Sequence, residues 1–568
     1  MLIPFLFLLS ATPIKTYMMD TVVVVGTRTP TKLSESSRAI TVIKDFTTSS
    51  LSDALKTALS VNASDRGLPG VQTDLSIRGS TFNQALVLVN GIRMNDPQTS
   101  HHNLEIPFMV SDIDKIEILG GSASSIYGPD AFGGVVNIIT RPAGEKFHAS
   151  AGTSFGTYNA QLKTASVENE KAGLSYESSS SDGYRENTDF KNSTYGAQYS
   201  TKLTHTFINY MEKEFGAADF YGQHYAREHT NTIFSGIKLE NRLLKTNVYS
   251  RIHKDKYTQN ITNPDSPVNR HTVYTIGAET QLSTKSFILG TETVFDYLTS
   301  NILDNHIVGK FALFGQLRKK IGRRMFFITG IRSDYNSLYG WQTNPRFELS
   351  KGFRSPIKIR VSVGHAFRTP SFTELYYNVG NLRGNPNLKP ENAWNYEAGI
   401  DYTVKNFTLM NSVFIRDGNN IIDWVGESDG FVHARNITSD RVKGIETGLT
   451  SKILRLNYTY LWAQNMQTAK YIRNRAKQLI SGELKYTFPY GIETSIDGLY
   501  KELQDTVMVQ GTTYYYVFNG KLSVEIQATT SIKGKLFLQG MNLLDAYYKD
   551  LNMEMPGRGY QVGIKLEI

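Results

Sequence analysis

From about residue 146 to residue 568, apolar and polar residues alternate in one segment after another. In the segment 560–568, the apolar positions are Tyr560, Val562, Ile564, Leu566 and Ile568. The same alternation recurs in 357–364 and 395–404, and in 456–462, where only Leu461 breaks it. Because successive side chains of a strand point to opposite faces, each segment is expected to form a β-strand with one apolar and one polar face.

Three features distinguish these strands from those of a soluble β-sandwich, which also alternate. The segments run to about nine or more residues, enough to cross a bilayer at the tilt of a barrel strand. Their polar faces carry Lys, Arg and Glu in mid-strand, which suits a water-filled lumen. Tyrosines stand near segment ends, where an interfacial girdle would lie, at Tyr376-Tyr377, Tyr514-Tyr515-Tyr516 and Tyr547-Tyr548. Since a closed barrel satisfies every backbone group in lipid, the pattern favours an all-β transmembrane barrel over a soluble β protein.

The composition agrees with strands and excludes several other classes of protein. The 568 residues include 32 Tyr, 29 Phe and 46 Gly but 17 Pro, a balance typical of strands and tight turns. The absence of cysteine excludes disulfides, thiolate metal sites and cysteine nucleophiles. Lys and Arg exceed Asp and Glu by 61 to 52 without a dense basic block, so we expect no nucleic-acid partner.

Residues 20–142 have a different pattern and predict a small mixed α/β globule. Short apolar strands are expected at Ala85–Val89 and Val135–Ile139. A helix is expected at Ser52–Leu59, with Ser52 as its N-cap. The composition changes again before the alternating region begins at residue 146, which indicates two domains.

The first residues indicate export. Met1–Leu9 has the length of a signal-peptide core and is followed by Ser10 and Ala11, although no basic residues precede it. We interpret 1–19 as a weak signal peptide, with a buried N-terminal strand as the alternative.

Seven strings of residues follow one another in a fixed order. The globule carries a β-prone run at Asp20–Val25, SIRGS at Ser76–Ser80, ALVLVNGIRMND at Ala85–Asp96 and IEILGGSASSIYGPDAFGGVVNIITRP at Ile116–Pro142. The alternating region carries GHAFRTPSFTELYY at Gly364–Tyr377, GNPNLKPE at Gly384–Glu391 and NLLDAYY with PGRGYQVGIKLEI within Asn542–Ile568. In this order they resemble a TonB-dependent outer-membrane receptor over nearly the whole chain past residue 20.

The resemblance implies an architecture and a partner. It implies a barrel of 22 antiparallel strands over 146–568 in the bacterial outer membrane, with a plug domain over 27–142 inside the lumen. It also implies that 20–26 is the TonB box region, which binds TonB of the inner-membrane energy-coupling complex. The residues of this box would be Asp20, Thr21, Val22, Val23, Val24 and Val25. An unpaired β-prone segment can add a strand to a partner's sheet, but an ordinary first plug strand is the alternative.

Arg78 is expected to hold the plug to the barrel. It stands in an apolar setting and needs a carboxylate partner if buried. In the family the matching arginine contacts glutamates of the wall, and the matching positions here are Glu397 and Glu446. By alternation, both face the lumen. The chain departs from the family at Gly120-Gly121-Ser122, where Arg-Gly-Pro is usual, so we expect a weaker lock.

Substrate contacts are expected from plug loops that face outward. The candidates are Thr81, Phe82, Asn83, Gln84, Asn95, Asp96, Gln98, Thr99, Ser100, His101, His102 and Asn103. Adjacent strand residues point in opposite directions, so the pair His101-His102 is not expected to chelate one ion, and the sequence predicts no metal ligands and no cofactor. The region Phe367–Leu388 contains no histidine, which disfavours haem as the substrate.

The sequence favours active import over two other functions. The sequence motifs of the plug are nearest to those of cobalamin-type receptors, so a corrinoid or a ferric siderophore is the expected cargo. The receptor is expected to be a monomer in outer-membrane lipid, with or without a surface lipoprotein. A passive porin or adhesin barrel is the first alternative, but such a channel has no use for a plug. A secreted β-enzyme such as a glycosidase is the second, but no catalytic motif is present and the strands have continuous apolar faces, so no catalytic residue is predicted.

Overall fold

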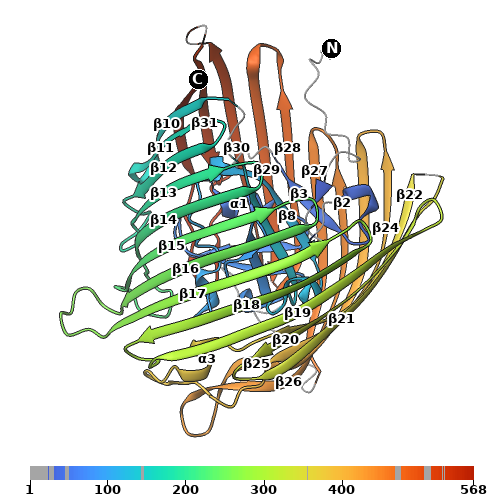
Figure 1. Ribbon diagram of the computed structural model, residues 1–568. Helices are drawn as coiled ribbons and strands as arrows, with labels where there is room; N and C mark the ends of the chain where they lie inside the picture. The colour runs from blue at the N-terminus through green and yellow to red at the C-terminus, as the bar shows by residue number, and fades with distance from the viewer. Residues whose placement is uncertain are drawn as a thin grey trace.

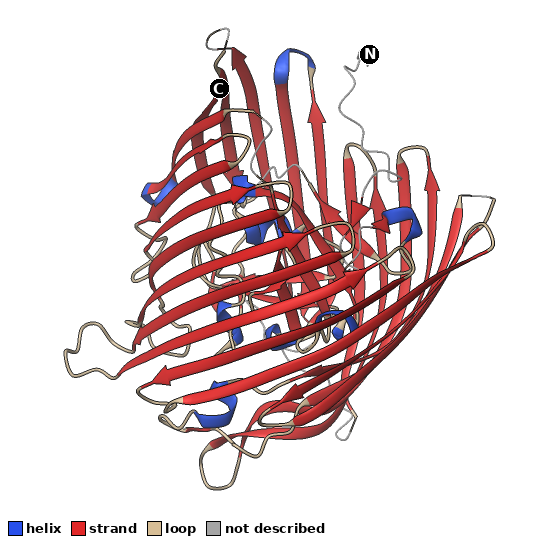
Figure 2. Cartoon of the chain, viewed as in Figure 1, coloured by secondary structure: helices blue, strands red, loops and turns tan. Residues whose placement is uncertain are grey.

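A computed structural model describes residues 23–24, 28, 31–44, 50–142, 146–354, 356–466, 475–503, 513–527, 529 and 531–568. These residues form a closed β-barrel whose lumen holds the N-terminal globule (Figure 1). We call that globule, residues 31–142, the plug. Strands dominate the molecule, and its helices are short (Figure 2). Among the described residues, no helix has the length and apolar character needed to cross a membrane.

Twenty-two antiparallel strands form the wall, and β34 pairs with β10 to close the ring, for example through Val562 and Phe155. The predicted fold class is therefore confirmed. The strands are β10 (His148–Gly156), β11 (Ala160–Glu168), β12 (Ala172–Ser181), β13 (Phe190–Ser200), β14 (Thr204–Gly216), β15 (Arg227–Glu240), β16 (Leu244–Thr258), β17 (Val268–Ser283), β18 (Phe287–Ser300), β19 (His306–Ile321), β20 (Met325–Asn336), β21 (Gly340–Gly352), β22 (Ile357–Arg368), β24 (Glu391–Val404), β25 (Phe407–Gly426), β26 (Val432–Thr450), β27 (Leu454–Asn465), β28 (Ala476–Thr487), β29 (Ile492–Leu503), β30 (Tyr514–Gln527), β31 (Lys533–Met541) and β34. The last strand spans Gly559–Glu567, and β23 (Leu382–Arg383) adds a short parallel pairing to β26.

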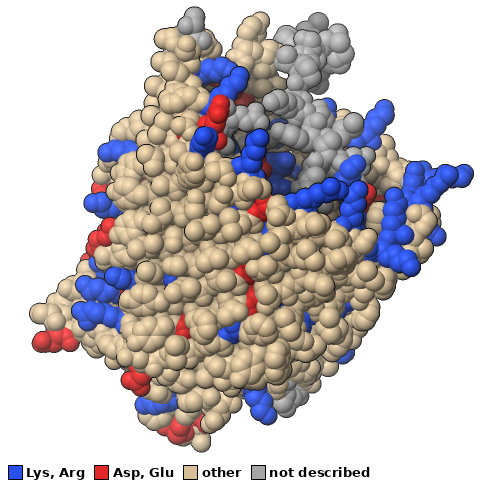
Figure 3. All heavy atoms as spheres, in the orientation of Figure 1, with Lys and Arg blue, Asp and Glu red and all other residues tan. Residues whose placement is uncertain are grey.

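The outer face of the wall is apolar and the inner face is polar, as the alternation predicts. Tyr560, Val562 and Leu566 of β34 are exposed on the outside. Few charged side chains interrupt the middle of the wall that faces the viewer in Figure 3. Conversely, Arg346 and Arg360 are among the largest fully buried side chains of the molecule. A lipid-facing exterior around a polar lumen explains both observations.

The barrel has two distinct ends. Ile568 lies at one of them, which we call the near end, and the short helix α3 (Phe372–Tyr376) lies at the other, which we call the far end (Figure 1). Longer connections such as 217–226, 369–390 and 542–558 are at the far end, whereas hairpins such as 322–324 turn at the near end.

The plug is built on a five-stranded sheet that packs within the lumen. The order of its strands is β3 (Ile40–Ile43), β8 (Ile113–Gly120), β9 (Gly134–Thr140), β6 (Ala85–Val89) and β7 (Ile92–Arg93). A separate hairpin is formed by β4 (Val61–Asp65) and β5 (Thr73–Ile77), and two short helices are α1 (Leu51–Lys56) and α2 (Ser124–Tyr127). Every residue of β6 is buried, which explains its unbroken apolar sequence. A Cβ atom at Gly133 would lie 2.4 Å from Ser80 Cβ, so this crossing of two backbones requires glycine.

The predicted helix at Ser52–Leu59 is displaced in the structure. Helix α1 has Ser50 as its N-cap, because the Ser50 hydroxyl accepts a hydrogen bond from the Asp53 amide at 3.1 Å. Ser52 is therefore inside the first turn, and the prediction of Ser52 as the cap was wrong. The helix ends at Lys56, and Ser60 beyond it takes a positive φ of 62°.

Most of the predicted export and coupling segments lie outside the described residues. This applies to the signal peptide at 1–19 and to Asp20, Thr21, Val22 and Val25 of the TonB box. Val23 and Val24 form the short strand β1, which pairs with β2 (Thr31–Lys32) apart from the main plug sheet.

Candidate functional site

Arg78 joins the plug to the barrel wall through two glutamates. It follows β5 with a positive φ of 53°, a backbone conformation that directs the chain into the next turn. Its Nη1 donates to Glu397 Oε2 of β24 at 2.7 Å, and its Nε and Nη2 donate to the two oxygens of Glu446 of β26 at 2.7 and 2.6 Å. Its guanidinium carbon also lies 4.5 Å from the centre of the Phe414 ring. The structure thus brings together the three residues that the sequence analysis groups as a lock.

The two wall glutamates that contact Arg78 also have other hydrogen-bond partners. Arg360 of β22 donates to Glu397 Oε1 at 2.8 Å, so both oxygens of that glutamate are used. Ser60 of the plug donates to Glu446. Burial alone would lower the pKa of Arg78, but the two carboxylates outweigh it and raise that pKa above its usual value. Removing one partner from such a buried network leaves an uncompensated charge.

At Gly120-Gly121-Ser122, where the family usually has Arg-Gly-Pro, the structure shows how the plug accommodates the missing arginine. A Cβ atom at Gly120 would lie 2.7 Å from the Arg78 guanidinium carbon, so glycine makes room for the arginine. A second plug arginine, Arg38, donates from Nη2 to the Gly120 carbonyl at 2.7 Å and lies 3.7 Å from Glu348 of the wall. The sequence analysis missed Arg38, because the second plug arginine of the family is usual at Gly120-Gly121-Ser122, which lies far from Arg38 along the chain.

Several predicted substrate residues stabilise the plug loops that lie toward the far end, which we call the apex of the plug. Thr81 and Gln84 form a capping box around the turn η3 (Phe82–Gln84), and buried Gln84 donates to Glu391 at 2.8 Å. Asn95 bridges the backbone of β6 by accepting from Val87 and donating to Ala85. Such side chains shape the loops and have little freedom to bind a ligand.

The second apex loop is anchored in the same way. Asp96 is buried and pairs with Arg251 of β16 at 2.6 Å. Gln98 is also buried and donates to Thr373 of α3 at 3.2 Å. Asn103 is buried and accepts from the Asp96 amide at 3.1 Å. The candidates with partly exposed side chains are Thr81, Phe82, Asn83, Asn95, Thr99, Ser100 and His101.

His101 belongs to a group of aromatic residues that faces the far end. Its ring stacks on Phe82, with 4.3 Å between centroids, and meets Tyr221 of the β14–β15 connection at 5.8 Å. Its Nδ1 lies 2.8 Å from Asp74 Oδ1, and Arg66 holds the same carboxylate at 2.8 Å. These two partners lower the pKa of Asp74 despite its burial, whereas burial lowers the pKa of His101. The exposed Tyr221 was missed, because it stands in a connection without a motif.

His102 contacts other residues than His101 does. The two histidines lie in a 3-10 turn and not in the strand that the sequence analysis assumed, so the strand alternation is not the reason for this separation. His102 is the last residue of the turn η4 (Ser100–His102) and packs against β15 and β16 with Glu105, Glu228, His253 and Asp255. A second group of metal-binding residue types, Glu427, Asp429 and His433, is largely exposed at the β25–β26 connection.

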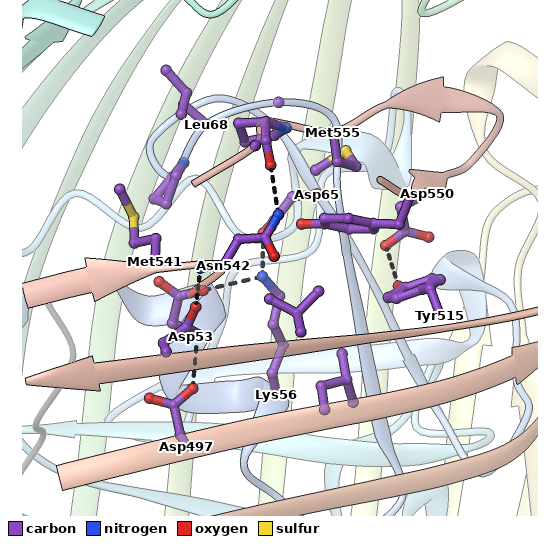
Figure 4. A pocket seen from close by; sticks show the side chains of 18 of the residues that line it. Asp53, Lys56, Asp65, Leu68, Asp497, Tyr515, Met541, Asn542, Asp550 and Met555 are labelled. Carbon is purple, nitrogen blue, oxygen red and sulfur yellow. Dashed lines mark hydrogen bonds and ion pairs between the residues drawn. The ribbon is translucent and has the colours of Figure 1, made fainter. Parts of the chain in front are cut away.

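Small cavities remain between the plug and the wall. One of about 80 Å³ lies between α1 and strands β29–β31, where Lys56 points toward Asp53 and Asp65 and where Tyr515 donates to Asp550 (Figure 4). Another of about 210 Å³ lies along β11–β14, and one of about 50 Å³ beside Asn83 and Asn95. Pockets for organic ligands measure about 300–1,000 Å³. These cavities are therefore too small for a nutrient complex while the plug is in place.

The sequence matches two family models. The model described as "TonB dependent receptor-like, beta-barrel" matches residues 127–562, and the "TonB-dependent Receptor Plug Domain" matches residues 32–135. The vitamin B12 transporter BtuB of Vibrio vulnificus (strain YJ016) is 24% identical over 479 residues, which cover 75% of this chain and 75% of that protein.

Solved structures share the fold at low identity. The siderophore receptor PirA of Acinetobacter baumannii has a TM-score of 0.73 at 15% identity, covering 93% of this chain and 98% of that one. A mutant of the ferric enterobactin receptor PfeA of Pseudomonas aeruginosa, in complex with enterobactin, has a TM-score of 0.75 at 16% identity, with coverages of 94% and 100%. The copper transporter OprC has a TM-score of 0.75 at 15% identity, with coverages of 93% and 100%.

Proposed function

Because the chain belongs to the TonB-dependent receptors of the bacterial outer membrane, we propose that it actively imports a corrinoid such as cobalamin, or a ferric siderophore, across that membrane. The family consists of receptors that take up small-molecule nutrients and interact with TonB, and it is not a family of enzymes. The near end of the barrel then faces the periplasm, and the far end faces the outside.

One observation carries the proposal of active transport: a folded plug fills the lumen and is tied to the wall by buried ion pairs. Arg78 alone holds two wall glutamates at 2.6–2.7 Å. Leaving one such buried charge without its partner costs about 3–5 kcal/mol, so at equilibrium the plug stays paired with the wall in all but a small fraction of molecules. The plug therefore blocks the lumen at rest, and we propose that TonB, acting through the segment 20–26, displaces it during import.

The relatives and the apex support the class of cargo. The curated relative at 24% identity is a vitamin B12 transporter, and two of the structural neighbours are siderophore receptors. The outward surface offers stacked aromatic rings at Phe82 and His101 with the exposed Tyr221 beside them. Flat rings next to polar groups suit a large, partly aromatic or macrocyclic ligand. We propose a monomer for transport, with a surface lipoprotein as an optional partner.

A passive porin or adhesin is the competing function, and uptake in cells separates the two. Labelled cobalamin and a panel of ferric siderophores are compared for binding and uptake in cells that carry the intact receptor, Val23→Pro or the control Val23→Ala. Proline removes a backbone donor that strand addition to TonB would use, whereas alanine keeps it.

We expect one ligand to bind all three receptors equally and to enter only through the intact and Val23→Ala receptors. Uptake that proceeds equally through Val23→Pro would contradict energy coupling and favour the passive barrel. Failure of every ligand in the panel to bind would overturn the proposed class of cargo.

A further inference from the structure

A buried cluster of histidines and carboxylates lies where the plug meets strands β15 and β16, toward the far end. The plug contributes His102 and Glu105, and the wall contributes Glu228, His253 and Asp255. All five side chains are more than nine-tenths buried. The rings of His102 and His253 lie 4.7 Å apart between centroids. None of these residues takes part in the contacts of Arg78.

The two nitrogens of His102 face different partners. Nδ1 lies 3.3 Å from Glu105 Oε1, whereas Nε2 lies 3.5 Å from Glu228 Oε1 and 3.8 Å from Asp255 Oδ2. Ligand atoms at about 2.0–2.1 Å from a tetrahedral ion stand about 3.4 Å from one another. The Nε2 atom thus stands near the tetrahedral spacing from each carboxylate oxygen, and the three atoms all lie within 4.8 Å of one another.

The charges of the cluster leave two carboxylates without a full counter-charge. Asp96 nearby is paired with Arg251 at 2.6 Å, and Glu105 lies 3.4 Å from Lys213 and accepts from Thr230 at 2.9 Å. Among the ion pairs of the described residues, Glu228 and Asp255 have only His102 as a partner. Burying two carboxylates beside one imidazole is costly, and a divalent cation would balance them.

Unpartnered polar atoms are a second, independent observation at the same place. In the described part of the chain, Glu228 Oε2, Asp255 Oδ1 and His253 Nε2 are buried and have no hydrogen-bond partner. Buried polar groups are nearly always satisfied, so three such atoms in one cluster indicate a ligand.

We propose that His102, Glu228 and Asp255 bind one divalent transition-metal ion of the Zn²⁺ type. Imidazole and carboxylate donors suit such ions, whereas Ca²⁺ takes six to eight oxygen ligands. Glu105 acts as the outer carboxylate that accepts from His102 Nδ1 and directs Nε2 to the metal, and Lys213 and Thr230 hold Glu105. Glu105 and Lys213 also line the cavity of about 210 Å³.

The ion links the plug to the wall, because one ligand belongs to η4 and two belong to β15 and β16. This site is independent of the nutrient that the receptor imports. Binding an ion to the folded state alone also raises the melting temperature of the protein.

The test uses the full-length receptor in detergent, stripped of metal by a chelator and titrated with Co²⁺. The intact receptor is expected to bind one Co²⁺ per chain with the visible absorption of a tetrahedral site, and Zn²⁺ is expected to displace it. The double variant Glu228→Gln/Asp255→Asn keeps the shape of both side chains and is expected to lose the absorption. Glu105→Gln is expected to weaken binding by about 10- to 100-fold, as other losses of outer carboxylates do. Circular dichroism verifies that each variant is folded.

Two control variants test whether Co²⁺ binds at the proposed cluster and not at another histidine. His101→Gln changes the neighbouring histidine, and His433→Gln disables the exposed group at the β25–β26 connection; both are expected to bind Co²⁺ as the intact receptor does. Binding that persists in the folded double variant, or that disappears in His433→Gln, would overturn the proposal. So would the absence of binding by the intact receptor, or displacement of Co²⁺ by Ca²⁺ as readily as by Zn²⁺.

Discussion

Arg78 of the plug donates two parallel hydrogen bonds to the carboxylate of Glu446 of the wall, from Nε at 2.7 Å and from Nη2 at 2.6 Å. Such a forked pair fixes both direction and distance, which a lysine at the same place would not do. Because Glu446 lies on β26, the pair sets the position of the plug relative to one side of the wall.

Replacing Arg78 by alanine is expected to loosen the plug. The substitution leaves Glu397 and Glu446 buried with fewer partners, at a cost of about 3–5 kcal/mol. Hydrogen exchange of plug amides, followed by mass spectrometry in detergent, measures the loss of protection. Arg354→Ala, at an exposed position of a near-end turn, is the control and should leave exchange unchanged. Equal protection in the two variants would mean that the ion pairs do not hold the plug.

Adding one methyl group at Gly120 is expected to disturb the same contact. In Gly120→Ala the new Cβ would lie 2.7 Å from both Nε and the guanidinium carbon of Arg78, so the arginine must move away from its glutamates. Overpacking of this kind costs about 1–3 kcal/mol. Thermal unfolding in detergent compares it with Gly426→Ala, where a Cβ meets nothing within 4 Å. A melting temperature equal to that of the control would show that Arg78 has room to adjust.

The stability of the receptor is expected to fall as the pH rises through the range set by Asp112, the last residue of η5 (Val110–Asp112). Burial raises the pKa of Asp112 to about 6, above the value of about 3.9 in an unfolded chain. Between these values the folded state binds more protons, so its stability decreases with pH. Asp112→Asn removes this dependence. Melting temperatures of the two proteins should agree at about pH 4, and the variant should melt higher at about pH 7.5. The reverse order at neutral pH would contradict the assignment.

Removing the ring of Tyr221 is expected to weaken the binding of the imported nutrient. Aromatic contacts contribute about 0.5–1.5 kcal/mol, so Tyr221→Ala should raise the Kd by about two- to tenfold. Equilibrium binding to cells measures the change. Tyr490→Ala is the control, because Tyr490 is 94% exposed at the near end of the barrel. Unchanged binding by Tyr221→Ala would place the ligand elsewhere on the far end.

The barrel could be predicted from the sequence because its determinants are local. Alternation in 560–568 gives both the strand and the face that meets lipid, and the structure has β34 at Gly559–Glu567 with Tyr560 and Val562 outside. The limits of α1 were less predictable. Ser50 and Ser52 are both plausible caps, and only the hydrogen bond to Asp53 distinguishes them.

The junction of plug and wall was predictable only where a motif marked it. Arg78 stands within SIRGS, and the alternation places Glu397 and Glu446 on the inner face. Arg38 and the partners of His102 have no such mark, because Glu228 and Asp255 reach the plug only through the register and curvature of the closed wall. A pattern along one strand contains no information about which distant loop that strand will meet.

The pairing of β10 with β34 has a consequence for how the molecule is made. These strands belong to opposite ends of the barrel sequence, and residues 150–156 join 561–567. Until β34 is present, the growing sheet has two open edges with unpaired backbone groups, which lipid cannot satisfy and which invite aggregation. Insertion must therefore wait for the whole wall, and an incomplete chain would depend on chaperones to shield both edges.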